Sequence, residues 1–373
     1  MSEPRTNGAD APDLDAFRDP ALARQLIGTI HDLVGDRELN LMEVCGTHTM
    51  SIGRYGFRTA MPAALHLLSG PGCPVCVTAN RDIDHAIALA QLDGAIITTF
   101  GDMMRVPGST SSLAAQKAAG RDVRIVYSPL DALDIAERNP ERQVIFIAVG
   151  FETTTPAIAA CILEAAERDL PNFSVLCAHK TTPAALRAIA ADPHTRIDGF
   201  LLPGHVSTIT GVVPYQFLVD EFGIPGVVTG FEPVDLLEGI ALLARMAIEG
   251  TPRIENAYRR GVQERGNVTA RALVDQVFEP CDATWRGLGP IPASGMGIRS
   301  AFTRFDARTR FEVSVEPTQE PRGCRCGDVL RGRIAPTGCP LFGRVCTPEQ
   351  PVGPCMVSSE GSCAAYFRYR EEA

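Results

Sequence analysis

The sequence predicts an α/β fold with two parallel-sheet α/β/α units and a small C-terminal domain. Three observations support this prediction. Continuous apolar runs such as VIFIAV (144–149) alternate with helical segments, which is typical of parallel sheets covered on both faces. The motifs GFETTTP at Gly150 and CAHKTTP at Cys177 both read as strand, Thr-Thr-Pro and helix. The last fifty residues hold six of the twelve cysteines, which sets this segment apart.

The expected elements follow one another in a regular order. Asp19 and Pro20 have the residue types of a helix cap and a first helical position, so a helix is expected from Asp19 to Leu33. One apolar strand then leads into a loop at Cys45, and a second leads into GPGCPVC with Cys73 and Cys76. Further strands are expected near 94–99, 123–127, 142–149, 173–179, 198–203 and 226–229, and helices near 81–91, 132–139, 156–169, 181–190 and 233–247.

The Thr-Thr-Pro motifs suit helix starts, because a threonine hydroxyl can cap the helix and proline is favoured at its first position. Their repetition indicates either two similar α/β units or two unrelated helices that happen to use the same capping residues. After Gly250 a helix is expected around Ile254–Arg265, before the Gly/Pro-rich stretch GLGPIPASGMG. The predicted organisation is a disordered lead-in (1–15), a first α/β domain with both cysteine loops (16–140), a second α/β domain (141–250), a connecting region (251–320) and a C-terminal cluster domain (321–373).

Composition narrows the function classes. The net charge of −9 argues against a nucleic-acid surface, which needs a basic stripe. No apolar stretch reaches the roughly 18 residues needed to span a bilayer, and the acidic start MSEPRTNGADAPDLD does not resemble a signal peptide. We therefore expect a cytoplasmic protein with reduced thiols, in which clustered cysteines indicate metal or redox chemistry. The chain has neither G-x-G-x-x-G nor a P-loop motif, so a nucleotide-binding enzyme is not favoured.

The first candidate site combines Cys45 in CGTHT with Cys73 and Cys76 in GPGCPVC. Each motif follows an expected strand, and the carboxyl ends of parallel strands converge on one crevice. Thiolates suit iron–sulfur centres, zinc or other late metals, and a Cys-Pro-Val-Cys pair can also cycle between dithiol and disulfide. His48 is a candidate fourth ligand, proton carrier or hydrogen-bond donor behind the ligands. A structural zinc site or a plain redox pair remains the alternative.

The second candidate site lies in the tail, where four thiolates would complete a [4Fe–4S] site. Cys339, Cys346 and Cys363 are the expected ligands, with Cys324 or Cys326 as the fourth. The long spacings favour an iron–sulfur cluster over the paired cysteines of a zinc ribbon, although four cysteines also suit zinc. The remaining thiols Cys161, Cys177 and Cys281 are expected to be structural.

The motifs CGTHT, GPGCPVC, GFETTTP, PGHVS, GFEP and C-x6-C…MVSSEGSCAAY resemble the HypD family of [NiFe]-hydrogenase maturation proteins from about Asn40 to Tyr366. The resemblance implies a scaffold that assembles the Fe(CN)2CO group rather than a conventional turnover enzyme. It implies a HypC-type chaperone as partner and HypE, with HypF upstream, as cyanide source. It places the iron-site cysteines on Cys45, Cys73 and Cys76, and the [4Fe–4S] ligands within the C-terminal set without Cys355.

Cyanide transfer from a partner's thiocyanate to iron needs electrons, which the Cys73–Cys76 pair would supply if recharged through the cluster. His205 in PGHVS, Glu152 in GFETTTP and Glu232 in GFEP end expected strands, where they would act as proton donors or anchors for cyanide nitrogen. Each could instead cap a helix or pin a loop. Asp102 and Arg105 are weaker candidates that could simply pair. The competing functions are a thiol–disulfide oxidoreductase with an Fe–S relay but no mononuclear iron, and a zinc-stabilised interaction protein.

Overall fold

The structure is a computed structural model that describes residues 14–369. The predicted disordered lead-in therefore lies outside the described residues up to position 13, and its last two residues belong to the short 3-10 helix η1 (Leu14–Arg18). Within residues 14–369 no helix has both the length and the apolar character needed to cross a membrane.

One unit of the fold is built on a five-stranded, all-parallel sheet in the order β2-β1-β7-β8-β9. Its strands are β1 (Leu39–Glu43), β2 (Leu65–Ser69), β7 (Gly199–Pro203), β8 (Gly226–Thr229) and β9 (Ile254–Asn256). The chain leaves β1 for β2 on one side, while β7 lies on the other side of β1. The carboxyl end of β1 is thus a topological switch point, where the loops after neighbouring strands diverge and leave a crevice.

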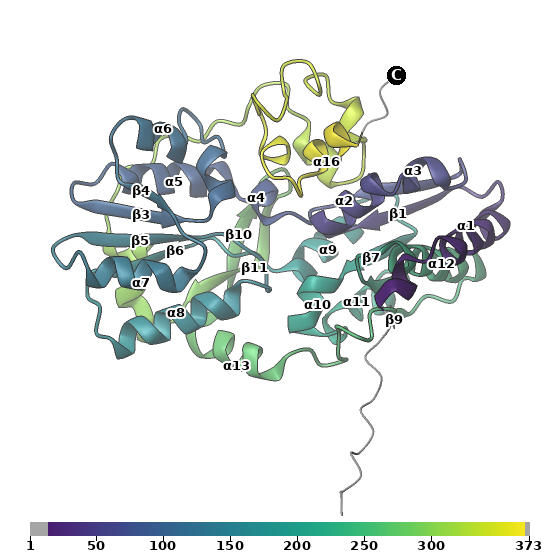
Figure 1. The fold of residues 1–373 in the computed structure, drawn as a ribbon, viewed down its shortest axis with the longest axis horizontal. Coiled ribbons are helices and arrows are strands. Elements are labelled where there is room, and N and C mark those ends of the chain that lie inside the picture. The colour runs from purple at the N-terminus through teal and green to yellow at the C-terminus, as the bar shows by residue number, and fades with distance from the viewer. Residues whose placement is uncertain (1–13, 370–373) are drawn as a thin grey trace, which may run out of the picture.

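The other unit is built on a four-stranded parallel sheet in the order β4-β3-β5-β6. Its strands are β3 (Ala95–Thr99), β4 (Val123–Ile125), β5 (Gln143–Ala148) and β6 (Phe173–Cys177). Both sheets therefore confirm the predicted class of two parallel-sheet α/β units. The two units lie side by side, and the C-terminal segment lies over the junction between them (Figure 1).

The predicted boundary between residues 140 and 141 does not separate the two sheets. Strands β3 and β4 lie before it and β5 and β6 after it, yet all four share one sheet. The chain starts the five-stranded sheet with β1 and β2, builds the whole four-stranded sheet, and then returns to pair β7 with β1. Pairing of strands that are distant in sequence decides this arrangement, and a linear division of the chain misses it.

Helices cover both sheets, and several begin where the sequence predicted. Helix α1 starts at Pro20, and the Asp19 carboxylate accepts a hydrogen bond of 2.7 Å from the Ala21 N–H, as expected of a cap. The α-helices are α1 (Pro20–Val34), α2 (Gly46–Arg54), α3 (Phe57–Ala60), α4 (Pro74–Val77), α5 (Asn80–Ala90), α6 (Leu113–Ala118), α7 (Pro129–Glu137), α8 (Thr155–Glu167), α9 (Thr182–Ala190), α10 (Gly204–Thr210), α11 (Phe217–Asp220), α12 (Pro233–Glu249), α13 (Val268–Val277), α14 (Ala307–Arg310), α15 (Cys326–Leu330) and α16 (Ser362–Arg368). The remaining 3-10 helices are η2 (Gly101–Arg105), η3 (Val213–Tyr215), η4 (Ser300–Phe305), η5 (Pro336–Gly338) and η6 (Pro354–Met356).

The region after Gly250 differs from its prediction. The helix expected around Ile254–Arg265 is wrong, because Ile254 pairs with Gly226 and the segment adds β9 to the edge of the five-stranded sheet. The Gly/Pro-rich stretch forms β11 (Gly289–Ile298), which pairs with β10 (Phe278–Trp285) in an antiparallel hairpin. This hairpin runs between the two units toward the C-terminal domain (Figure 1).

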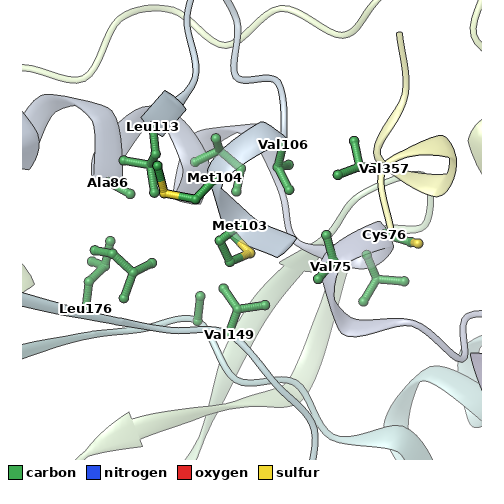
Figure 2. Packing of buried hydrophobic residues seen from close by; sticks show 14 of the residues in the cluster. Val75, Cys76, Ala86, Met103, Met104, Val106, Leu113, Val149, Leu176 and Val357 are labelled. Atoms are coloured by element: carbon green, nitrogen blue, oxygen red, sulfur yellow. The ribbon is translucent and has the colours of Figure 1, made fainter. Parts of the chain in front are cut away.

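A single buried cluster joins the four-stranded unit to the C-terminal domain. It includes Ile97 and Ile145 of the sheet, Cys76 of the second loop, and Cys326 and Cys355 of the C-terminal domain. Figure 2 shows Cys76 at the edge of this core, beside the C-terminal segment that carries Val357. The apolar packing therefore continues from the sheet to the cysteines without a polar layer between them.

Candidate metal and redox site

The two N-terminal cysteine loops touch each other at the switch point. The Gly46 N–H donates a hydrogen bond of 3.0 Å to the Gly72 carbonyl. A methyl group added to Gly72 would lie 2.4 Å from the backbone nitrogen of Cys45. The strands β1 and β2 end side by side, so their loops meet as the sequence predicted. Glycine at position 72 is required by this close approach of two backbones.

The three thiols occupy helix starts in a buried setting. Cys45 precedes α2 and Cys73 precedes α4, and the Cys76 N–H donates a hydrogen bond of 3.3 Å to the Cys73 sulfur. Burial raises the pKa of Cys45 to about 12, and the negative charge of Glu360 adds to the rise. Among the described residues 14–369, no three His, Cys, Asp or Glu side chains have the arrangement of a single-ion site. Metal binding here would thus require both deprotonation and closure of the thiols.

Two carboxylates beside Cys45 were missed by sequence reasoning. The Glu43 side chain lies beneath the loop, where it accepts hydrogen bonds from the Cys45 N–H at 3.2 Å and from the Thr49 hydroxyl. Burial raises the pKa of Glu43 to about 7. Glu360 of the C-terminal domain accepts a hydrogen bond of 2.8 Å from the Thr47 hydroxyl. The only sequence signal for Glu360 was a charged residue inside the rare motif SSEGSC.

Both predicted histidines pack against Phe231, which follows β8. The His48 ring centroid is 5.0 Å from that of Phe231, and the His205 centroid is 3.9 Å from it. His48 is fully buried, its Nε2 lies 3.3 Å from the Thr229 carbonyl, and its Nδ1 has no hydrogen-bond partner among the described residues. Burial lowers the pKa of His48 to about 4 and also lowers that of His205. Both rings are therefore neutral at pH 7 and able to donate or accept one hydrogen bond.

The predicted glutamates have partners of their own. Glu152 accepts hydrogen bonds from the Thr182 N–H at 2.8 Å and the Thr182 hydroxyl at 3.0 Å, so it caps α9 in place of the expected threonine. Glu232 accepts hydrogen bonds from Arg18 at 2.5 and 2.7 Å. These contacts agree with the alternative of a helix cap and a pinned loop. A role for either carboxylate in the reaction stays a prediction.

Asp102 and Arg105 do not pair with each other in the way considered from the sequence. Asp102 accepts a hydrogen bond of 3.0 Å from the Ser358 hydroxyl, and Arg105 donates to the Val357 carbonyl at 3.4 Å and the Pro348 carbonyl at 3.3 Å. Both residues follow β3 at the switch point of the four-stranded sheet. They therefore hold the C-terminal domain against this unit.

The six C-terminal cysteines line one small cavity of about 20 Å³. These are Cys324, Cys326, Cys339, Cys346, Cys355 and Cys363. The other lining residues are apolar or glycine, such as Phe342 and Met356. Burial raises the pKa of Cys363, and the neighbouring thiols raise it further. A dry cavity with several convergent thiols suits a group that bonds to sulfur and carries its own positive charge.

Cys355, which the resemblance left outside the ligand set, contacts both another cysteine of this cavity and the segment next to Cys76. Its sulfur lies 2.9 Å from that of Cys326, and both residues are buried. The preceding residue Pro354 presents its carbonyl to the Cys76 sulfur at 3.8 Å. Cys355 therefore lies between the Cys73–Cys76 loop and Cys326. Spacing alone could not reveal this, because the contact joins opposite ends of the chain.

The thiols expected to be structural are separate from both sites. Cys161 is fully buried in α8, where its sulfur donates to the Pro129 carbonyl at 3.3 Å. Cys177 donates to the Met296 carbonyl at 3.1 Å, and Cys281 is exposed on the hairpin. Substitutions of these three cysteines can therefore serve as controls in experiments on the two candidate sites.

The chain is similar to known proteins along nearly its whole length. A family model named HypD and described as "Hydrogenase formation hypA family" matches residues 21–370. A hydrogenase maturation factor HypD from Rhodobacter capsulatus is 48% identical over 364 residues, which cover 95% of this chain and 97% of that protein. Those from Cupriavidus necator and Escherichia coli K12 are 46% and 43% identical, over 95% and 96% of this chain and 96% and 98% of their own lengths. The chain belongs to the HypD family of hydrogenase maturation factors.

Proposed function

We propose that the chain binds one iron ion as its substrate through Cys45, Cys73 and Cys76 and builds on it the Fe(CN)2CO group of [NiFe] hydrogenase. The observation that carries the proposal is the line of buried thiols from these loops to the C-terminal cavity. Cys76 approaches the Cys355 segment, and Cys355 contacts Cys326 at the cavity wall. Such a line provides a water-free route for electrons to the place where iron would bind.

The C-terminal cavity suits a [4Fe–4S] cluster. Because Cys326 and Cys355 contact each other, we assign them as a dithiol pair and not as ligands. The four cysteines that remain are Cys324, Cys339, Cys346 and Cys363. Four thiols in an apolar pocket match the ligand number of such a cluster. The bound cluster would supply electrons one at a time, and two of them reduce one disulfide.

The chain's own thiols would pass these electrons on by exchange. The Cys355 thiolate attacks the Cys76 sulfur of an oxidised Cys73–Cys76 pair, which forms a Cys355–Cys76 disulfide and releases the Cys73 thiolate. The Cys326 thiolate then attacks the Cys355 sulfur and releases the Cys76 thiolate. The result is a reduced Cys73–Cys76 pair and an oxidised Cys326–Cys355 pair, with two electrons transferred.

The reduced Cys73–Cys76 pair would then release cyanide from the thiocyanate carried by a HypE-type partner. One thiolate attacks the thiocyanate sulfur and expels cyanide, which binds the iron. The other thiolate resolves the mixed disulfide, frees the partner's thiolate and restores the Cys73–Cys76 disulfide. During this step Cys45 and the chaperone would hold the iron, and Cys73 and Cys76 would bind it after the relay has reduced them again. A HypC-type chaperone would share the iron, HypF would act upstream of HypE, and this chemistry would take place in the cytoplasm, where the partners' thiols stay reduced.

His48 and His205 would serve the bound ligands. Both rings are neutral at pH 7 because burial lowers their pKa values. A neutral imidazole N–H can donate a hydrogen bond to a cyanide nitrogen without adding a charge to the pocket. His48 also has an unused ring nitrogen, which suits a polar ligand that binds beside Cys45.

One observation favours a second function. The described side chains do not form a preorganised single-ion site, whereas the dithiol contacts are already in place. A thiol–disulfide oxidoreductase that uses the same cluster and relay without mononuclear iron would need nothing more. The presence or absence of iron-bound cyanide and carbon monoxide distinguishes the two functions.

The test is anaerobic isolation of the chain with its HypC-type chaperone, followed by iron and sulfide analysis and infrared spectroscopy. The wild type is expected to hold iron in excess of sulfide and to show cyanide and carbon monoxide stretches. Cys45→Ala should lose the excess iron and the stretches but keep equal amounts of cluster iron and sulfide. The exposed Cys281→Ser serves as the matched control and should behave as wild type.

The relay has its own test. Cys355→Ser is expected to keep the cluster but to leave the Cys73–Cys76 disulfide oxidised after the cluster is reduced, as measured by thiol alkylation and mass spectrometry. Reduction of that disulfide at the wild-type rate would exclude Cys355 from the route. If active preparations showed no cyanide or carbon monoxide stretches, iron assembly would be refuted and the oxidoreductase function supported. If the purified protein were colourless and contained zinc, both functions would be excluded.

A further inference from the structure

The tip of the β10–β11 hairpin is fixed beside the start of α15. A methyl group added to Gly327 would lie 2.7 Å from the Gly287 carbonyl oxygen, so the two backbones are in direct contact. Arg331, the residue after α15, donates hydrogen bonds to the Gly287 carbonyl and, at 3.1 Å, to the Leu288 carbonyl. The Arg286 N–H is bound to the Val77 carbonyl at 2.8 Å. Arg286 is therefore held in a defined place next to Cys326.

The Arg286 side chain is unusual because its charge is buried and only partly paired. It is 2% exposed, and its Nε lies 3.3 Å from the carboxylate of Glu320, which is 61% exposed. Its two terminal nitrogens, Nη1 and Nη2, are buried without hydrogen-bond partners among the described residues. A buried cation with unpaired donors is costly, so a fold keeps one only where an anion compensates it. Glu320 pairs only with Nε and sits largely in solvent, where its charge is screened.

Besides Glu320, two cysteines share a cavity with Arg286. Arg286, Cys324 and Cys326 line the same cavity of about 520 Å³ between the hairpin and the C-terminal domain. Cys324 and Cys326 also line the C-terminal thiol cavity, so the two cavities share a wall. The buried guanidinium of Arg286 therefore lies on the other side of that wall from the remaining thiols.

We propose that Arg286 is the counter-ion of the anionic cluster held by the C-terminal thiols and that it makes this cluster easier to reduce. The inference rests on the proposed function, because it requires the cluster. Four thiolates outweigh the positive charge of an iron–sulfur core, and each added electron makes the assembly more negative. A fixed cation at the cavity wall stabilises the reduced form more than the oxidised form. Net charge and nearby hydrogen-bond donors are known to set cluster potentials.

The test compares cluster potentials in the full chain by redox titration followed with electron paramagnetic resonance. At the wild-type midpoint, Arg286→Met is expected to lower the ratio of reduced to oxidised cluster at least tenfold, equivalent to about 59 mV for a one-electron couple. Arg286→Lys keeps the charge and should change the ratio less than threefold. Arg322→Met is the matched control, because Arg322 is exposed near the same cysteines and its charge is screened. It should change the ratio less than twofold.

The outcomes separate this inference from the proposed function. A wild-type chain without sulfide and without cluster absorption would refute the proposed function and this inference together. An intact cluster with an unchanged midpoint in Arg286→Met would refute the role of Arg286 alone. If Arg286→Met loses the cluster, Arg286→Lys and Arg286→Gln are compared, because only the lysine keeps the positive charge. Retention of the cluster in Arg286→Lys but not in Arg286→Gln would support Arg286 as the counter-ion. If both variants lost the cluster, or both kept it with the same midpoint potential, the role of Arg286 as counter-ion would be refuted.

Discussion

Replacement of Gly72 with alanine is expected to separate the two N-terminal cysteine loops. The added methyl group would lie 2.4 Å from the nitrogen and 2.5 Å from the Cα of Cys45, about 1 Å short of the 3.4 Å at which ordinary contacts begin. Both opposing atoms belong to the backbone, so no side-chain rotation can relieve the clash. Overpacking of this kind costs about 1–3 kcal/mol. The melting temperature should fall by roughly 1–2 °C for each kcal/mol lost, because the unfolding entropy grows with chain length.

The effect on iron should exceed the effect on stability. Metal sites tolerate errors of only about 0.2 Å in ligand distances, so a displaced Cys45 is expected to lower iron affinity about tenfold or more. The assay measures iron in excess of sulfide and the melting temperature of the same sample. The sulfide content should change less than the excess iron, because Gly72 is not among the residues that line the C-terminal cavity.

Gly28→Ala provides the matched control for this substitution. Gly28 lies in α1 with nothing within 4 Å of an added methyl group. Alanine is the better helix former by about 1 kcal/mol, so this variant should melt at the wild-type temperature or above. If Gly72→Ala matched the wild type in both melting temperature and excess iron, the reasoning from loop contact would be wrong.

Three further predictions concern stability. Asp19→Ala removes the cap of α1 and should cost about 0.5–2 kcal/mol in urea unfolding; an unchanged midpoint would contradict the capping role. Burial raises the pKa of Glu43 from 4.5 to about 7, so its contribution to stability is present below pH 4.5 and is lost as pH rises to 7. Relative to Glu43→Gln, the wild type should therefore lose up to about 3 kcal/mol between these pH values in urea titrations, and a parallel pH profile would exclude the shift. A fragment of residues 16–140 should show no cooperative unfolding by circular dichroism, because it lacks the strands that flank β1 and β3 on one side; cooperative melting of the fragment would refute this.

Local sequence signals predicted much of the fold. The apolar run of β5 is fully buried from Val144 to Ala148, which only a central strand of a covered sheet allows. Asp19 and Pro20 start α1 because their side chains act on their own helix end. These signals are decided within a few residues, so they can be read without the rest of the chain.

Signals that depend on distant partners could not be read in this way. Ile254, Tyr258 and Val262 recur at helical spacing, yet Ile254 pairs with β8 instead of forming a helix. The helix in this region is α13, and its N-cap Asn267 accepts a hydrogen bond from the Ala270 N–H at 3.0 Å. Tertiary pairing outweighed local periodicity, as the small energies of helix propensity allow.

In the candidate site, too, local signals could be read from the sequence and contacts between distant residues could not. Cys45, Cys73 and Cys76 were found because each follows a strand, and the parallel sheet brings such loops together. Glu360 and Cys355 were missed because their positions depend on how the C-terminal domain packs over the junction of the two units. A residue whose role comes from contact with the opposite end of the chain leaves no local pattern.

The order of strands in the chain explains how the sites come to face each other. Because the chain returns from the four-stranded sheet to pair β7 with β1, it joins the two units at two crossings, one between β2 and β3 and one between β6 and β7. The C-terminal domain then contacts both units, through Glu360 beside Cys45 and through Ser358 on Asp102. Fixed on two sides, it holds Cys355 against the Cys76 loop. Precise thiol contacts need a rigid frame, and here the contacts of the C-terminal domain with both units contribute to it.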